Sequence, residues 1–192
     1  FIGDGAIHYQ FSKADKEIKQ PSKEDMMKPG FVPEQTTYTM DRMDVELVGA
    51  NKNARVIAEQ KQDYAENYFT DWSGEKGATV RAYNSRTYKN IYPNIDWVLY
   101  TSNGTLEHEF IVHKGGKVSD IQLKYGGAKG LKINADGSLT ATTPQGMITE
   151  KAPDTYQKDG TKVSSGFVLN GNVLSYNTGD YTGERVIDPT LS

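Results

Sequence analysis

The residues best suited to chemistry in this sequence are two histidines and two glutamates in one short stretch. His108 and His113 lie five apart, with Glu107 and Glu109 on either side of the first. A zinc-protease motif needs two histidines four apart on one helical face. This stretch instead alternates like a strand, in which an odd spacing sends the two imidazoles to opposite faces. We therefore expect His108 to be a partly buried structural residue beside Phe110, His113 to be solvated, and no metal site.

Glu107 and Glu109 share one face of the same strand, about 6.5–7 Å apart at a rise of ~3.3 Å per residue. Paired carboxylates at that separation could suit glycoside hydrolysis. The pattern is also the ordinary polar face of an amphipathic strand, and the sequence has no Gly-x-Ser-x-Gly elbow and few histidines to act as a base. The prediction is a protein without catalytic residues, and a hydrolase built on these two acids stays open as an alternative.

Three aromatic residues are candidates for binding rather than for catalysis. Trp72, Tyr68 and Tyr92 fall in or beside expected loops, the last within Asn90–Asn94. An aromatic ring in a loop can stack on a sugar or anchor a protein partner. The other interpretation of these rings is packing at the edge of the core. Trp97 alternates with apolar neighbours in an expected strand and is predicted to lie in the core.

Composition excludes several classes of function. The chain has 192 residues, with 22 Lys and Arg against 25 Asp and Glu, which gives a net charge of −3. This balance offers no basic surface for a nucleic-acid backbone. There is no cysteine, so thiol chemistry and Cys-ligated metal sites are excluded. No apolar run reaches the ~18 residues of a membrane span. No motif for a cofactor is present, since the glycines of Gly126–Gly130 lack the Lys-Ser/Thr ending of a phosphate-binding loop.

The elements that would position these residues are short strands. The sequence has 19 Gly and 12 Tyr, a bias typical of β-proteins. Asn or Asp followed by Gly marks a tight hairpin turn between alternating runs, and four such pairs occur: Asn103-Gly104, Asp136-Gly137, Asp159-Gly160 and Asn170-Gly171. The prediction is an all-β, antiparallel β-sandwich of about a dozen short strands with little helix, forming a single domain over residues 1–192.

The N-terminal third is patterned less regularly. The segment Ser12–Gly30 is dense in charge and carries two prolines, so we expect an exposed loop or insertion with one helical turn around Glu24–Met27. Downstream, the apolar residues of Tyr38–Met40 and Met43–Leu47 have opposite parity. Since side chains alternate strictly along a strand, this predicts a bulge or a break near Asp41–Arg42.

Three stretches resemble a known family. They are Val45–Ala54, Tyr88–Tyr100 continuing into Leu106–Gly116, and Val186–Pro189. Together they resemble an uncharacterised domain near the N-terminus of large exported bacterial proteins. That domain is often followed by SBBP-type β-propeller repeats, and in Bacteroidetes-like bacteria by adhesion-type modules and a sorting signal for type IX secretion. The likeness runs from about Val45 to Pro189.

The resemblance implies an extracellular or cell-surface location and a modular parent chain, of which this sequence would be a piece. It implies no catalytic residues. The expected function is therefore a non-catalytic structural or interaction module, with neighbouring domains of the parent chain or a surface protein as partners. The alternative is a glycan-binding module that uses Trp72, Tyr68 or Tyr92.

Overall fold

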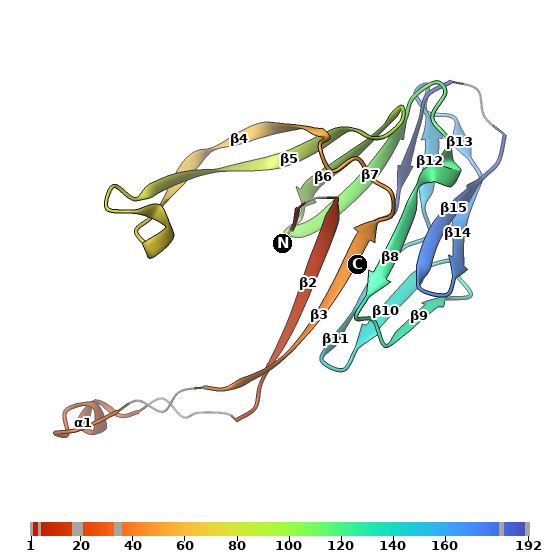
Figure 1. Cartoon of the computed structure of the whole chain (residues 1–192). Helices are drawn as coiled ribbons and strands as arrows, with labels where there is room; N and C mark the ends of the chain where they lie inside the picture. The colour runs from red at the N-terminus through yellow and green to blue at the C-terminus, as the bar shows by residue number, and fades with distance from the viewer. Residues whose placement is uncertain (1, 4, 17–20, 33–35, 181–182, 191–192) are drawn as a thin grey trace.

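The computed structural model describes residues 2–3, 5–16, 21–32, 36–180 and 183–190, without the side chain of Trp72. Two large antiparallel sheets face each other, and a small third sheet covers one end of the pair (Figure 1). This confirms the prediction of an all-β sandwich. Among the described residues, the only α-helix is α1 (Lys23–Met26), with 3-10 turns η1 (Asp71–Ser73) and η2 (Val118–Asp120).

The sheets combine strands that are far apart in the sequence. The six-stranded sheet has the order β1 (Ile2–Gly3), β2 (Ala6–Ala14), β3 (Tyr38–Leu47), β8 (Gln122–Gly126), β15 (Val173–Thr178) and β14 (Ser165–Asn170). The seven-stranded sheet has the order β13 (Lys162–Val163), β12 (Asp154–Gln157), β16 (Arg185–Asp188), β7 (Thr105–Val112), β6 (Ile95–Ser102), β5 (Ala78–Tyr92) and β4 (Arg55–Tyr68). The third sheet consists of β11 (Gly146–Glu150), β10 (Leu139–Thr143) and β9 (Gly130–Ile133).

The core lies between the two large sheets, as the alternating patterns require. Trp97, Phe110 and Ile187 project inward from the seven-stranded sheet, and Met43 and Leu123 project from the other. Each of these side chains is at most 1% exposed. The prediction that Trp97 belongs to the core is therefore confirmed, and the rings of Trp97 and Phe110 stack with centroids 6.4 Å apart.

Three details of the strand prediction were wrong. β3 runs unbroken, in continuous register with β2 from Glu46 to Tyr38. The parity change needs no bulge because Tyr38 and Met40 are exposed and never enter the core. β4 has 14 residues and β5 has 15, so these strands are much longer than expected. β5 also continues through the expected loop as far as Tyr92, because this part of the strand is packed into the core.

Candidate functional site: two projecting arms and the groove at their base

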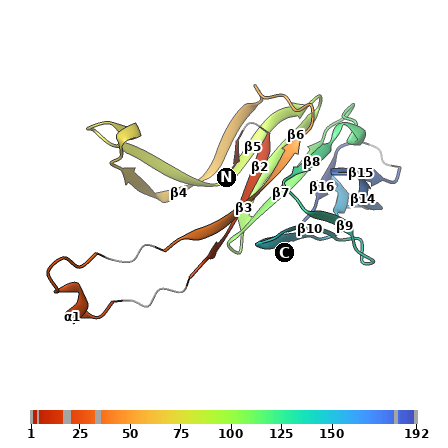
Figure 2. The same cartoon turned by 60° about the horizontal axis from the view of Figure 1, so that its bottom comes forward.

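Two long hairpins project from the same side of the sandwich, as Figures 1 and 2 show. The first arm is the outer part of the β2–β3 hairpin, which we define as Ser12–Met40. It leaves the sheet because β8, the other neighbour of β3, ends at Gly126, which pairs with Asp44. Beyond that point β3 has only β2 as a strand partner among the described residues. The expected charged, exposed segment thus forms the outer end of a hairpin.

The described tip of the first arm carries α1. Ser22 is the N-cap, and its hydroxyl accepts a hydrogen bond from the backbone N–H of Asp25 at 3.1 Å. This confirms the predicted helical turn. No described residue of the first arm is buried, so the arm adds no side chain to the core.

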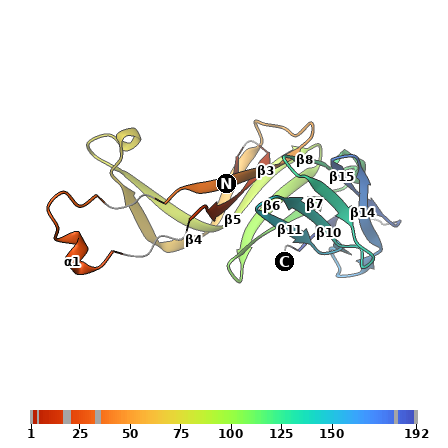
Figure 3. The same ribbon diagram turned by 90° about the horizontal axis from the view of Figure 1, so that it is seen from below.

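The second arm is the outer part of the β4–β5 hairpin, which we define as Lys61–Tyr83. It begins where β6 stops, since the last β5–β6 pair on this side is Ser85 with Tyr100. The register between β4 and β5 shifts between Lys61 and Ala65, which marks an irregularity at the root of the arm. Seen from below, both arms extend away from the sandwich on the same side (Figure 3). No described residue of the second arm is buried.

The arms concentrate the exposed apolar surface of the protein. Of the fourteen large hydrophobic side chains that are exposed in the described chain, ten lie on the arms. Contiguous exposed apolar surface is typical of interaction sites, whereas single exposed residues are ordinary. The ten are Met26, Met27, Val32, Tyr38 and Met40 on the first arm, and Tyr64, Tyr68, Phe69, Val80 and Tyr83 on the second.

One face of the second arm carries both apolar and acidic side chains. Tyr68 pairs with Ala78 and Glu66 pairs with Val80. Because side chains alternate along a strand, Glu66, Tyr68 and Val80 project from the same face. The Tyr68 hydroxyl donates a hydrogen bond to Glu66 Oε2 at 2.5 Å, and this bond raises the pKa of Tyr68. The exposed ring of Tyr68 is thus presented to solvent beside a carboxylate.

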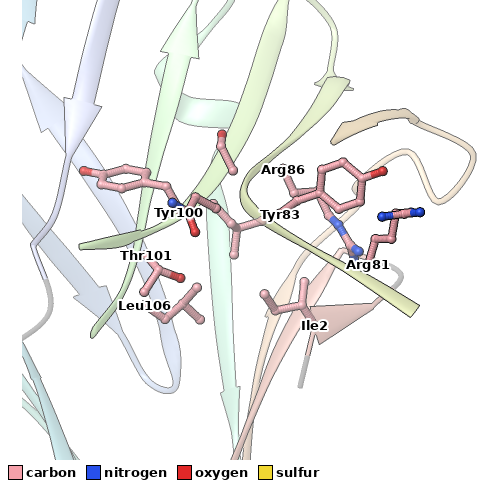
Figure 4. A pocket seen from close by; sticks show the side chains of 10 residues that line it. Ile2, Arg81, Tyr83, Arg86, Tyr100, Thr101 and Leu106 are labelled. Atoms are coloured by element: carbon pink, nitrogen blue, oxygen red, sulfur yellow. The ribbon is translucent and has the colours of Figure 1, made fainter. Parts of the chain in front are cut away.

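A groove lies at the base of the second arm, where β5 leaves the sandwich. Its volume is about 290 Å³. Figure 4 shows Arg81, Tyr83 and Arg86 along one side of it, Thr101 and Leu106 along the other, and Ile2 at the lower end. We name it the arginine groove; its remaining lining residues are Asn84, Ser85, Leu99 and Tyr100.

The seven-stranded sheet carries a hydrogen-bonded ionic network elsewhere. Asp96 is 2% exposed in its side chain, and its Oδ2 accepts from Lys89 Nζ at 2.6 Å and lies 2.8 Å from His113 Nε2. His113 Nδ1 lies 2.5 Å from Glu184 Oε2. The hydrogen bond to Asp96 is the main cause that raises the pKa of His113, although partial burial opposes it. The side chain of His113 is 36% exposed, so it is partly solvated as expected, and two carboxylates also bind its ring.

Glu107 and Glu109 do not lie together on an open face of the sheet. Glu107 is only 6% exposed, so the expectation that both acids lie on a wet face was wrong for this residue. Burial, followed by the charge of Asp188, raises the pKa of Glu109. Burial, followed by Glu107 and Asp154, raises the pKa of Asp188 in turn. Glu107, Glu109 and Asp188 thus form a crowded, largely buried cluster of acids. In the described chain, no group of three or more potential ligands is arranged to hold a metal ion.

His108 and Glu150 are among the ionisable groups enclosed inside the protein. His108 is 1% exposed, and its Nδ1 accepts from Trp97 Nε1 at 3.4 Å. Burial lowers the pKa of His108 to about 4, so the imidazole is neutral. The predicted structural role of His108 is therefore confirmed. Glu150 is 2% exposed, and Tyr125 Oη donates to its Oε1 at 2.7 Å. Burial raises the pKa of Glu150 to about 7.

The three aromatic candidates have different positions. Tyr68 is on the second arm and 37% exposed. Tyr92 is 4% exposed, and its hydroxyl donates to the backbone carbonyl of Val48 at 3.0 Å. Its ring has no face for a sugar in this structure, because Tyr92 ends a core strand and not a loop. The side chain of Trp72 lies outside the described part of the structure, although its backbone belongs to η1.

The sequence did not identify the arginine groove. Arg81 and Arg86 have no motif around them, and only the end of β6 on the neighbouring strand leaves space beside them. The exposed apolar surface of the first arm could have been recognised from the sequence. Met26 and Met27 are consecutive apolar residues in a highly charged segment, a pattern that a solvated loop does not need.

The model of the family named Domain of unknown function (DUF7948) matches residues 1–190. The chain therefore belongs to this family. No curated protein and no solved structure matches it. No helix in the described part of the chain is long and apolar enough to cross a membrane.

Proposed function

We propose that this DUF7948 domain is a non-catalytic interaction module of an exported, multidomain bacterial surface protein. Its two arms would hold a neighbouring domain of the parent chain or another surface protein. The observation that carries the proposal is that the arms hold ten of the fourteen exposed large hydrophobic side chains of the described chain. The export and the modular parent are supported by the resemblance of Val45–Ala54 and Tyr88–Gly116 described above.

The energetics of the arms support an interaction role. Fixing the backbone of one residue costs roughly 1–2 kcal/mol of conformational entropy, which burial of side chains normally offsets. Neither arm contributes a buried side chain in its described part. A partner that covers the apolar side chains would supply that burial, at roughly 25 cal/mol per Å² of apolar surface. We therefore infer that the arms are ordered most strongly when bound.

Glycan binding is the second candidate function. Tyr64 and Tyr68 lie on the second arm and are both exposed. The exposed ring of Tyr68, one of the three predicted aromatics, could stack on a sugar ring. This hypothesis now rests on the arm alone, since Tyr92 is buried.

Hydrogen exchange tests the proposed function. The exchange of arm amides is measured in the chain alone and in the intact protein isolated from the cell surface. We expect protection of Ser12–Met40 and Lys61–Tyr83 to rise in the intact protein, while amides of β7, in the core sheet, stay unchanged as the internal control. Equal exchange of both arms in the two samples would contradict the proposal. A glycan array on the chain and on the Tyr68→Ala variant tests the alternative, because arm-dependent hits support glycan binding.

A further inference from the structure

The seven-stranded sheet ends in an open edge on β4. β4 is the last strand of this sheet, and its one strand partner in the described chain is β5 (Figure 1). The first part of β4, Arg55–Glu59, pairs with β5 in continuous register. The regular edge then stops, because Gln60 has a φ of 55° and the register shifts between Lys61 and Ala65. A regular strand edge with unpaired backbone groups is a template for an added strand.

This edge has little of the protection that keeps edge strands apart. Proteins usually guard such edges with proline, lysine or a bulge. The sequence Arg-Val-Ile-Ala-Glu of residues 55–59 has no Pro, Lys or Gly. Val56 is 47% exposed, Ala58 is exposed and Ile57 is partly buried. The middle of the edge is therefore apolar and accessible to another strand.

The charged residues at the two ends of this edge have no counter-charge in the part of the chain that the structure describes. Arg55 and Glu59 are exposed, and neither forms an ion pair with a described residue. The residue of β5 opposite Arg55 is Lys89, a like charge that already binds a carboxylate. The residue opposite Glu59 is the neutral Ser85. Both charges are therefore available to a partner on the open side of β4.

The edge is complementary to a second copy of itself. In an antiparallel pair with a two-fold axis at Ile57, Arg55 of each copy lies opposite Glu59 of the other, and Val56 lies opposite Ala58. Opposite charges that face each other across two strands stabilise a sheet, whereas like charges destabilise it. An axis at Val56 or at Ala58 would separate Arg55 from Glu59. Charge therefore favours the axis at Ile57.

We propose that β4 binds a second copy of this chain through antiparallel pairing of Arg55–Glu59, with the two-fold axis at Ile57. The pairing joins the seven-stranded sheets of the two copies into one continuous sheet. Backbone hydrogen bonds supply the affinity in strand addition, and the side-chain pairs set the register. Because the paired segment is short, the interface is small and the dimer is weak and concentration-dependent.

Charge reversal tests the register. Sedimentation velocity of the whole chain at rising concentrations should show a monomer–dimer equilibrium. R55E and E59R should each weaken the dimer by about tenfold or more, because each variant places like charges opposite each other in both symmetry-related pairs. An equal mixture of the two variants should restore the affinity, since opposite charges then face each other again. K132E and E24R are the matched controls, because they change the net charge equally at exposed positions on β9 and α1.

A single cysteine locates the axis. The chain has no cysteine, so the thiol of I57C is unique. Directly opposed residues of antiparallel strands have Cα atoms about 4.5–5.5 Å apart, a distance that a disulfide can span. Mild oxidation should therefore cross-link I57C into a dimer. A65C lies on the same strand beyond Gln60 and should stay monomeric under the same conditions.

Several results would overturn the proposal. They are a monomer at every concentration, a dimer that R55E leaves unchanged, failure of R55E and E59R to associate when mixed although each keeps the circular dichroism of the wild type, or cross-linking of A65C in place of I57C. If either charge variant loses structure, the I57C cross-link decides. The proposed function does not depend on this dimer, since it is judged by protection of the arms, which begin beyond the paired segment.

Discussion

Replacing Glu150 with glutamine should reveal a pH dependence of stability that the wild-type chain hides. Burial raises the pKa of Glu150 from 4.5 to about 7. Because the folded pKa lies above the unfolded value, this group stabilises the fold fully below pH 4.5, and that contribution is lost as pH rises through 7. The shift corresponds to about 3 kcal/mol at ~1.4 kcal/mol per unit.

His108 has the opposite effect over nearly the same range. Burial lowers its pKa from 6.5 to about 4. The neutral imidazole therefore stabilises the fold above pH 6.5, and this contribution is lost as pH falls through 4. Its size is also about 3 kcal/mol on the same conversion. Between about pH 4.5 and 6.5 the two buried groups cancel, because the folded state gains one proton at Glu150 and loses one at His108.

Urea unfolding between pH 4.5 and 7.5, followed by tryptophan fluorescence, measures the effect. The indole of Trp97 is buried and reports on loss of the core. The unfolding free energy of E150Q minus that of the wild type should rise by about 3 kcal/mol from pH 4.5 to 7.5. Taking the difference removes contributions that both proteins share, including that of His113.

Two further variants make this test specific. Tyr125→Phe removes a hydrogen bond that lowers the pKa of Glu150, so the fall in stability should extend to higher pH. Glu24→Gln removes an exposed carboxyl from α1 and should leave the shape of the profile unchanged. A flat difference between E150Q and the wild type would refute the reasoning, since it would mean that Glu150 is already ionised in the folded protein.

Three other predictions concern the network, the arms and the core. His113→Gln should destabilise the fold by roughly 1–2 kcal/mol below pH 6.5 and by less at pH 8.5. The reason is that the pKa of His113 is raised in the folded state, so its contribution to stability is lost as pH rises. Urea unfolding below pH 6.5 and at pH 8.5 measures this difference. Replacing residues 12–40 or residues 60–84 by Asn-Gly should change the unfolding free energy by less than about 1 kcal/mol, because no buried side chain is removed. A larger loss of stability would show that the arms support the core. Phe110→Ala should cost about 3–5 kcal/mol by the same assay, and a loss below 1 kcal/mol would contradict the stacked core.

The body of the sandwich could be predicted because its signals are local. Asn103 and Gly104 adopt φ values of 50° and 79°, as a tight hairpin turn between two alternating runs requires. Alternation then placed Trp97 and Phe110 correctly on the inward face. The turn and its two flanking strands form one continuous segment, Ile95–Val112, so the local sequence contains most of the information.

The arms and the groove could not be predicted in the same way. Alternation indicates which side chains share a face, but not whether a second sheet covers that face. Tyr38 and Met40 have the apolar pattern of a core strand and yet are exposed, because β8 ends before it reaches them. Arg86 likewise borders a groove because the pairing of β6 with β5 ends at Ser85. Such features depend on where distant strands stop.

The two arms lack much of the protection that exposed strands usually have, which supports an interaction role for them. Natural proteins protect strand edges with charged side chains, short strands or covering loops. The first arm follows this rule in part, since charged residues are frequent along it, but its tip exposes Met26 and Met27. The second arm exposes Tyr64 and Phe69 on a strand hairpin that nothing in the described chain covers. The exposed apolar residues on these two hairpins therefore agree with the proposed role of the arms in binding a partner.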